Sequence, residues 1–168
     1  MTTSRYASLV LVAALLPTTP TYAIEAKDTS YFCGVEFSAG LAFNKSTKQW
    51  RSAKLKPTKK FVLRLKFLSS GIRKDDLGND ESVSDFNVTV TDAGSDNPLP
   101  CYPSQPQKSS ITTKLDDPWF SCSAGLYDLN INLGKNRFLA AHLVGYVNGL
   151  DVTGDTPTVS GGTCTKID

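Results

Sequence analysis

The chain has 168 residues, with 18 basic and 16 acidic side chains, and 40% of its residues are hydrophobic. This length suits one domain that buries most of its apolar side chains, and it argues against a second domain. The net charge is close to zero, so charge balance alone indicates no class of partner.

Residues 1–23 have the pattern of a secretory signal peptide. Arg5 precedes an apolar stretch from Ala7 to Leu16, and small residues lead to a cleavage site after Ala23. The apolar stretch is shorter than the roughly 20 residues that span a bilayer, and no later stretch is both long enough and free of charge. We therefore expect a single β domain over residues 24–168, with no transmembrane segment, that is periplasmic or secreted.

Alternating apolar and polar residues recur after the signal peptide, which is the pattern of half-buried strands. In "KFVLRLKF", for example, Phe61, Leu63, Leu65 and Phe67 share one face. In chain order, strands are predicted at 30–43, through Trp50, and at 60–67, 85–92, 117–124, 126–134, 136–149 and 162–168.

Turn signals and polar stretches separate these strands, and the two longest stretches, 69–84 and 93–118, are predicted loops. No stretch of twelve residues keeps a helical period. Short strands separated in this way predict an all-β fold, a single antiparallel β-barrel or β-sandwich domain of about seven or eight strands.

All four cysteines follow the signal peptide, so we expect two disulfides in an oxidising compartment. Spacing alone allows three pairings; we favour Cys101 with Cys122, closing a Pro- and Ser-rich excursion, and Cys33 with Cys164, joining the first strand to the last. A metal site is the alternative, but the chain has no CxxC pair and one histidine, so we expect no metal and no cofactor.

Charge is distributed unevenly along the sequence. From Phe37 to Lys74 there are eleven basic residues and no acidic one, whereas from Asp75 to Asp128 there are ten acidic residues and two basic ones. If the basic segment forms adjacent strands, its outward side chains make a positive face. In the alternative, the acidic loop at 75–85 folds over this segment and neutralises it. The candidate anion-binding face consists of Lys48, Trp50, Arg51, Lys54, Lys56 and Lys59.

An exported positive face suits lipopolysaccharide phosphates, anionic lipid head groups, acidic glycans or an acidic protein partner. Nucleic acid is not expected, because the aromatic and glycine signatures of its binding folds are missing. The partner class predicted by the sequence is therefore an anionic envelope component or a protein.

The single histidine, His142, is the residue best suited to act as a base near neutral pH. It lies in "RFLAAHLVGYV" among apolar residues on both faces of a predicted strand, which favours a packed, hydrogen-bonded role. No serine lies in a G-x-S-x-G turn. A carboxylate pair for glycoside hydrolysis stays possible but is not located by the sequence. The acidic cluster "KDDLGNDES" lacks the order of an EF-hand loop and favours a solvated loop.

Three segments carry a family resemblance: "FCGVEFSAGLAFNKSTKQW", "KPTKKFVLRLKF", and "NRFLAAHLVGYVNG" followed by "DTPTVSGGTCTKI". They resemble a group of small exported, β-rich proteins of Gram-negative bacteria with no assigned function. The most specific part is the C-terminal order of Gly145-Tyr146, Asp155-Thr156-Pro157 and Gly162-x-Cys164. The resemblance implies export and a compact, disulfide-containing β domain, and it implies no reaction.

Together these features predict a non-catalytic binding protein of the cell envelope, secreted or periplasmic, that contacts an anionic ligand or partner. An inhibitor of a secreted hydrolase, such as a lysozyme or a protease, is the alternative, by analogy with other small disulfide-linked β domains. A small hydrolase is the third and least favoured class, because no catalytic motif is visible.

Overall fold

The computed structural model describes residues 24–104, 108–147, 149 and 156–168. Within these ranges the chain forms ten strands and no helix, which confirms the predicted all-β class. The signal peptide predicted for residues 1–23 lies outside them. The strands are β1 (Thr29–Asn44), β2 (Gln49–Leu55), β3 (Lys60–Lys74), β4 (Asp80–Asp92), β5 (Leu99–Pro103), β6 (Ile111–Lys114), β7 (Trp119–Ala124), β8 (Tyr127–Asn132), β9 (Arg137–His142) and β10 (Thr158–Lys166).

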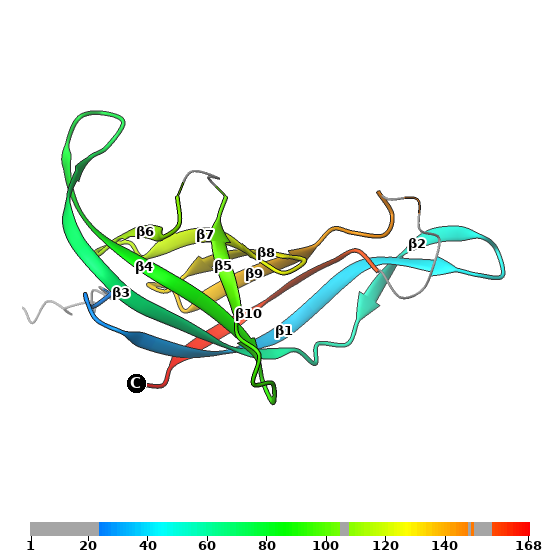
Figure 1. Cartoon of the computed structure of the whole chain (residues 1–168). Coiled ribbons are helices and arrows are strands. Elements are labelled where there is room, and N and C mark those ends of the chain that lie inside the picture. The colour runs from blue at the N-terminus through cyan, green and yellow to red at the C-terminus, as the bar shows by residue number, and fades with distance from the viewer. Residues whose placement is uncertain (1–23, 105–107, 148, 150–155) are drawn as a thin grey trace, which may run out of the picture.

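Eight of these strands close an antiparallel barrel (Figure 1). Strands β1, β3, β4, β5, β7, β8, β9 and β10 pair in that order, and β10 returns to pair with β1. The barrel, rather than the sandwich, is therefore the correct alternative, and its wall has the predicted number of strands. The other two strands lie off this path, with β2 paired to β1 and β6 paired to β4.

The core lies inside the barrel because alternate residues of each strand point inward. Phe61, Leu63 and Leu65 of β3 are buried, as the alternation in the sequence predicted. Phe86 of β4 and Ile131 of β8 are fully buried in the same way. The interior is thus filled mostly by apolar side chains from successive strands.

The barrel closes between β1 and β10, where the two backbones approach closely. A Cβ atom on Gly162 would lie 1.9 Å from the carbonyl oxygen of Gly34, so only glycine fits there. The Cys33–Cys164 disulfide joins the same two strands, with their Cα atoms 4.0 Å apart. The Gly162-x-Cys164 pattern in the sequence therefore marks the seam of the barrel.

The second disulfide, Cys101–Cys122, joins β5 to β7, so both predicted pairings are confirmed. All four cysteines are buried in the core. In the chain-entropy model, closing loops of these lengths stabilises the fold by roughly 3 kcal/mol for the shorter loop and about 5 kcal/mol for the longer one.

The prediction of a loop at 69–84 was wrong, because β3 continues to Lys74 and β4 begins at Asp80. The two strands form a long hairpin that extends beyond the barrel (Figure 1). In the outer part of this hairpin, most side chains on both faces are exposed to solvent. The sequence there lacks the alternation of apolar and polar residues from which a strand is predicted.

The predicted loop at 93–118 also contains two strands, β5 and β6. They are short, and both pair with β4: β6 pairs along its first half and β5 along its second half. β5 also pairs with β7, whereas the described pairings contain none between β6 and β7. Four or five residues are too few to show a clear period in the sequence.

The strand predicted at 136–149 is shorter than expected, because β9 ends at His142. Gly145 has a φ of 92°, a left-handed conformation that breaks extended structure. Beyond His142 the apolar side chain of Leu143 is exposed rather than buried. The apolar stretch of the sequence therefore continues past the end of β9, and Leu143 no longer belongs to the barrel wall.

The two ends of the barrel differ. At one end, here called the closed end, Ile24 is buried in the core and its backbone N–H donates to the carbonyl oxygen of Leu115 at 3.0 Å. Pro118 and Leu133 are buried at the same end. At the other end, here called the mouth, β7 and β9 end and β8 and β10 begin.

Candidate functional site

The residues of the predicted anion-binding face do not share one face. In β2, Trp50 and Lys54 lie on one side and Arg51 on the other, because successive residues of a strand point in opposite directions. Lys48 lies in the turn between β1 and β2, and Lys56 follows β2. Lys59, the sixth residue, lies at the mouth of the barrel.

Four of these cations form what we call the basic hairpin: Lys48, Arg51, Lys54 and Lys56. All four are exposed, and none has an ion pair or a hydrogen bond among the described residues. Trp50 contacts the ring of Phe43 at 5.4 Å and that of Tyr146 at 5.5 Å, measured between ring centroids. The aromatic residue of this hairpin therefore packs against its neighbours.

The acidic stretch neutralises a different set of cations. Arg73 donates to both carboxylate oxygens of Asp85, at 3.0 and 2.8 Å, and Lys74 pairs with Asp80 at 2.9 Å. Lys114 of β6 pairs with Glu81, and this hydrogen bond raises the pKa of Lys114. The predicted neutralisation therefore occurs on the β3–β4 hairpin, and within the part of the chain that the structure describes it does not reach the four cations of the basic hairpin.

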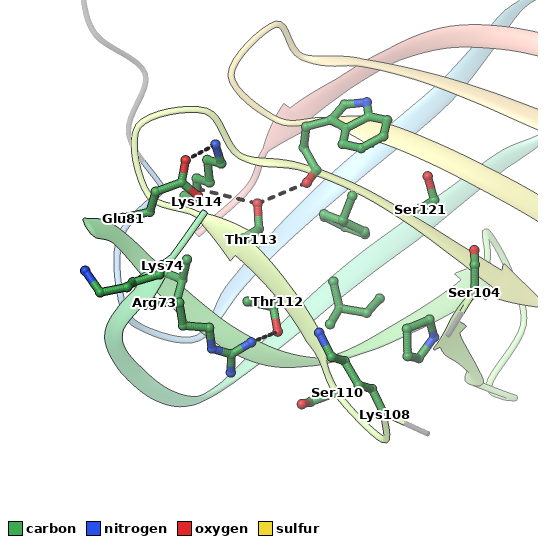
Figure 2. A pocket seen from close by; sticks show the side chains of 15 residues that line it. Arg73, Lys74, Glu81, Ser104, Lys108, Ser110, Thr112, Thr113, Lys114 and Ser121 are labelled. Atoms are coloured by element: carbon green, nitrogen blue, oxygen red, sulfur yellow. Dashed lines mark hydrogen bonds and ion pairs between the residues drawn. The ribbon is translucent and has the colours of Figure 1, made fainter. Parts of the chain in front are cut away.

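Arg73, Lys74, Glu81 and Lys114 line a groove of about 440 Å³ between β6 and β7 (Figure 2). The figure shows Glu81 turned toward Lys114, while Arg73 reaches Thr112 at 2.9 Å. Lysine and arginine are numerous here, but three of the four cations already have a carboxylate partner. The groove is therefore a weaker anion site than its composition indicates.

A more enclosed cavity of about 370 Å³ opens at the mouth of the barrel. Residues on, or next to, all eight strands of the barrel line it, so it is the part of the barrel interior next to the mouth. Its volume lies within the range of small-molecule sites, about 300–1,000 Å³, which often occur in the mouths of barrels. The apolar lining comprises Val35, Phe61, Val90, Leu99, Ala124, Leu126, Leu129, Phe138 and Ala140.

Four of the polar side chains that border this cavity form a chain of contacts from one to the next. The ammonium nitrogen of Lys59 lies 3.7 Å from the Asp92 carboxylate and 3.6 Å from the centroid of the Tyr127 ring. The Tyr127 ring lies 5.1 Å from that of His142. Asp92, Lys59, Tyr127 and His142 thus form a polar rim on an apolar cavity.

His142 has the structural contacts that its sequence context predicted. The ring is partly buried, and its Nδ1 lies 3.4 Å from the carbonyl oxygen of Thr156, in the segment that leads into β10. One face of the ring meets Tyr127. Because the residue also borders the mouth cavity, it combines a packing role with a place in the candidate site.

Comparison of the chain with protein-family models, with curated proteins and with solved structures finds no match. Within the described ranges, no three His, Cys, Asp or Glu side chains gather as they would around a metal ion. The same ranges contain no helix of the length and apolarity needed to cross a membrane. The mouth cavity must therefore be interpreted from its own geometry.

The sequence indicated two members of the rim, but it did not show that they belong together. Lys59 was assigned to a surface face and His142 to the core, while Asp92 and Tyr127 were not singled out. These residues lie on, or next to, four different strands, and only the register of the barrel brings them to one end. The site depends on strand pairing, and no local sequence motif identifies it.

Proposed function

We propose that the protein is an exported, non-catalytic binding protein that holds a small amphipathic molecule with an anionic end in the mouth of its barrel. The observation that carries the proposal is the apolar cavity whose rim includes Lys59. Eight-stranded barrels have interiors that are either filled by side chains or able to hold one small ligand. Here the closed end is filled and the mouth is open.

The lining favours a ligand with an apolar body. Nine aliphatic or aromatic side chains surround the space, and they come from rigid strands on several sides of the barrel. Each methylene group moved from water into such a site gains about 0.8 kcal/mol. A short alkyl chain or a small ring system therefore has enough contact area to bind.

Lys59 favours an anionic end on that ligand. Its ammonium group has three donors, and the Asp92 carboxylate at 3.7 Å lies beyond hydrogen-bond distance. The Tyr127 ring holds the ammonium at the rim without using a donor. A carboxylate, sulfate or phosphate group on the ligand can therefore bind Lys59 while its body enters the cavity.

Export is supported by the signal-peptide pattern of residues 1–23 and by the two buried disulfides, which persist in oxidising compartments. In the periplasm or outside the cell, amphipathic anions include fatty acids and fragments of envelope lipids. The proposed class of ligand therefore occurs in the compartment that we propose for the protein.

Calorimetric titration with sodium decanoate, decanol and decylamine tests the proposal. We expect decanoate to bind at one site and more tightly than the other two compounds. Lys59→Met should weaken decanoate binding about tenfold or more, because a hydrogen bond to a charged group is lost. The matched variant Lys54→Met removes a cation of the basic hairpin and should leave the affinity unchanged.

Two results would contradict the proposal. If none of the three compounds binds, the mouth cavity does not hold a small amphipathic ligand. If decylamine binds more tightly than decanoate, or if Lys54→Met weakens decanoate as much as Lys59→Met does, the rim does not select an anionic end.

The basic hairpin favours a second candidate function, contact with an anionic surface of the cell envelope. Its four cations have no acidic partner among the described residues, although the acidic stretch neutralises Arg73, Lys74 and Lys114 nearby in the sequence. The hairpin extends away from the barrel at the side opposite the β3–β4 hairpin (Figure 1). It can therefore reach a surface that the barrel itself does not touch.

A further inference from the structure

The outer wall of the barrel carries a second groove that is separate from the mouth cavity. It has a volume of about 590 Å³ and crosses β1, β10, β9, β8 and β7. Two exposed aromatic side chains lie at its two ends, Phe37 on β1 at 57% exposure and Trp119 on β7 at 55%. Both rings therefore present apolar surface to solvent beside the same groove.

The surface between the two rings is polar and is built from facing positions on neighbouring strands. Asn132 of β8 faces both Trp119 and Arg137, and Arg137 faces Thr163 of β10. In the next row, Asn130 faces Leu139. The polar groups therefore follow a line across the strands from Trp119 toward β1.

Several hydrogen-bond donors in this line have no partner among the described residues. The carbonyl oxygen of Asn130 accepts from Ser121 and that of Asn132 accepts from the backbone N–H of Lys135, which leaves both amide NH₂ groups available. Arg137 has no ion pair within the same ranges, and Thr163 donates to Glu36. The groove thus presents two held amide donors and an exposed guanidinium group, with the Glu36 carboxylate to balance its charge.

We propose that this groove binds a neutral, linear oligosaccharide of three or four sugar units. Sugar rings have an apolar face of C–H groups that stacks on aromatic rings, and their hydroxyl groups accept hydrogen bonds from amides and guanidinium groups. Neighbouring strands lie about 4.8 Å apart, so the path along the curved wall from β1 to β7, four steps, measures roughly 19 Å, which is about the length of three or four sugar units.

The position of Phe37 supports a platform rather than a mobile side chain. A Cβ atom on Gly161 would lie 2.2 Å from the Cζ atom of Phe37, so the ring rests directly on the backbone of β10 at a glycine. The ring is held against the wall from below while more than half of the side chain stays exposed. A rigid, exposed aromatic ring binds a stacked ligand with little loss of conformational entropy.

The probes are the β-1,4-linked tetrasaccharides cellotetraose and chitotetraose, titrated by calorimetry into the folded domain. We expect at least one to bind, with an affinity that does not change between low and moderate salt because the ligand is neutral. Trp119→Ala and Phe37→Ala should each weaken binding about tenfold or more, because each removes an aromatic ring on which a sugar stacks. Tyr102→Ala, which removes an exposed aromatic ring of β5 outside the groove, is the matched control.

The proposal is overturned if neither tetrasaccharide binds at millimolar concentration, or if Tyr102→Ala weakens binding as much as Trp119→Ala. It is also overturned if both groove variants bind like the parent protein. Lys59→Met should not affect this binding, so failure here and failure of the mouth-cavity proposal are separate results. All the substituted side chains are on the surface or at the rim, and circular dichroism verifies that each variant is folded.

Discussion

The two ends of the barrel are built from the same strands but have different contents. At the closed end, Ile24 joins the core and bonds to Leu115, and the rings of Phe67 and Phe86 pack with centroids 5.9 Å apart. At the mouth, the inward positions include Ala124 and Ala140, and a cavity of about 370 Å³ is left.

Side-chain size explains most of this difference. Inward positions at the closed end carry phenylalanine, leucine and isoleucine, and a segment from outside the barrel adds Ile24 to them. Alanine and Gly125 at the mouth leave space that large residues would fill. A close-packed interior is the normal outcome for a small barrel, so the unfilled end supports the binding role that we propose.

The largest expected effect on stability is at the closed end. Ile24→Ala removes a buried side chain from the core and should lower the free energy of unfolding by about 2–5 kcal/mol, measured by urea denaturation. Ile72→Ala removes an equal side chain from the exposed part of β3 and should change it by less than about 0.5 kcal/mol. Decanoate affinity should stay unchanged in both. An Ile24 variant as stable as the parent would show that the closed end is not part of the core.

Filling the mouth cavity should instead reduce decanoate binding and have a smaller effect on stability. Ala140 lines the cavity, so Ala140→Phe should reduce decanoate binding at least tenfold while changing stability by no more than about 1–3 kcal/mol. Ala141→Phe places the same ring on the outer face of β9 and serves as the control. Unchanged affinity in Ala140→Phe would mean that the ligand does not enter the barrel.

The β1–β2 and β3–β4 hairpins differ in charge, because the cations in the outer part of the second have carboxylate partners and those of the first have none among the described residues. Lys54→Glu with Lys56→Glu should abolish weak binding to phosphatidylglycerol vesicles at low salt, since each cation near such a surface contributes about 1 kcal/mol. The parent's binding should itself weaken as salt rises, because exposed charges are screened over about 10 Å at 0.1 M. Lys66→Glu with Lys135→Glu changes the net charge equally on other exposed surfaces. Equal losses in the two double variants would exclude a specific role for the basic hairpin.

The smallest expected effect is a local loss of stability in acid at the tip of the β3–β4 hairpin. The Asn79 side chain and two backbone N–H groups, those of Leu77 and Asn79, donate to Asp75 and lower the pKa of its carboxyl. A lowered folded pKa means that this stabilisation is present at neutral pH and is lost as pH falls through that value. The protection of the Leu77 and Asn79 amides from exchange, relative to their intrinsic rates, should therefore decrease in acid. Exchange that is independent of protonation, after correction for its intrinsic pH dependence, would contradict this.

The barrel wall was predictable because its strands bury one face and expose the other. The inward set of β3, from Phe61 to Leu65, could be predicted from alternation alone. The Cys33–Cys164 disulfide followed from the expectation that it joins the first strand to the last, and Cys101–Cys122 from the excursion that it closes. The outer half of β3 could not be predicted, because it has left the barrel and has no buried face. Alternation reports burial rather than strand structure itself.

The candidate sites were less predictable than the fold. Lys59 and His142 attracted attention for their chemistry, but the contact of each with Tyr127 depends on pairing between strands that are far apart in sequence. The small residues Ala124 and Ala140 give no signal in the sequence that distinguishes a cavity from a tight core. The separation of Arg51 from Lys54 required the register of β2.

The most direct test of the unfilled mouth is a decanoate titration followed by nuclear magnetic resonance with assigned side-chain signals. We expect concentration-dependent shifts at Tyr127, His142 and Ala140, which line the mouth, and none at Ile24 or Leu115 of the closed end. Shifts confined to the closed end or to the outer wall, or no shifts at saturating decanoate, would contradict it.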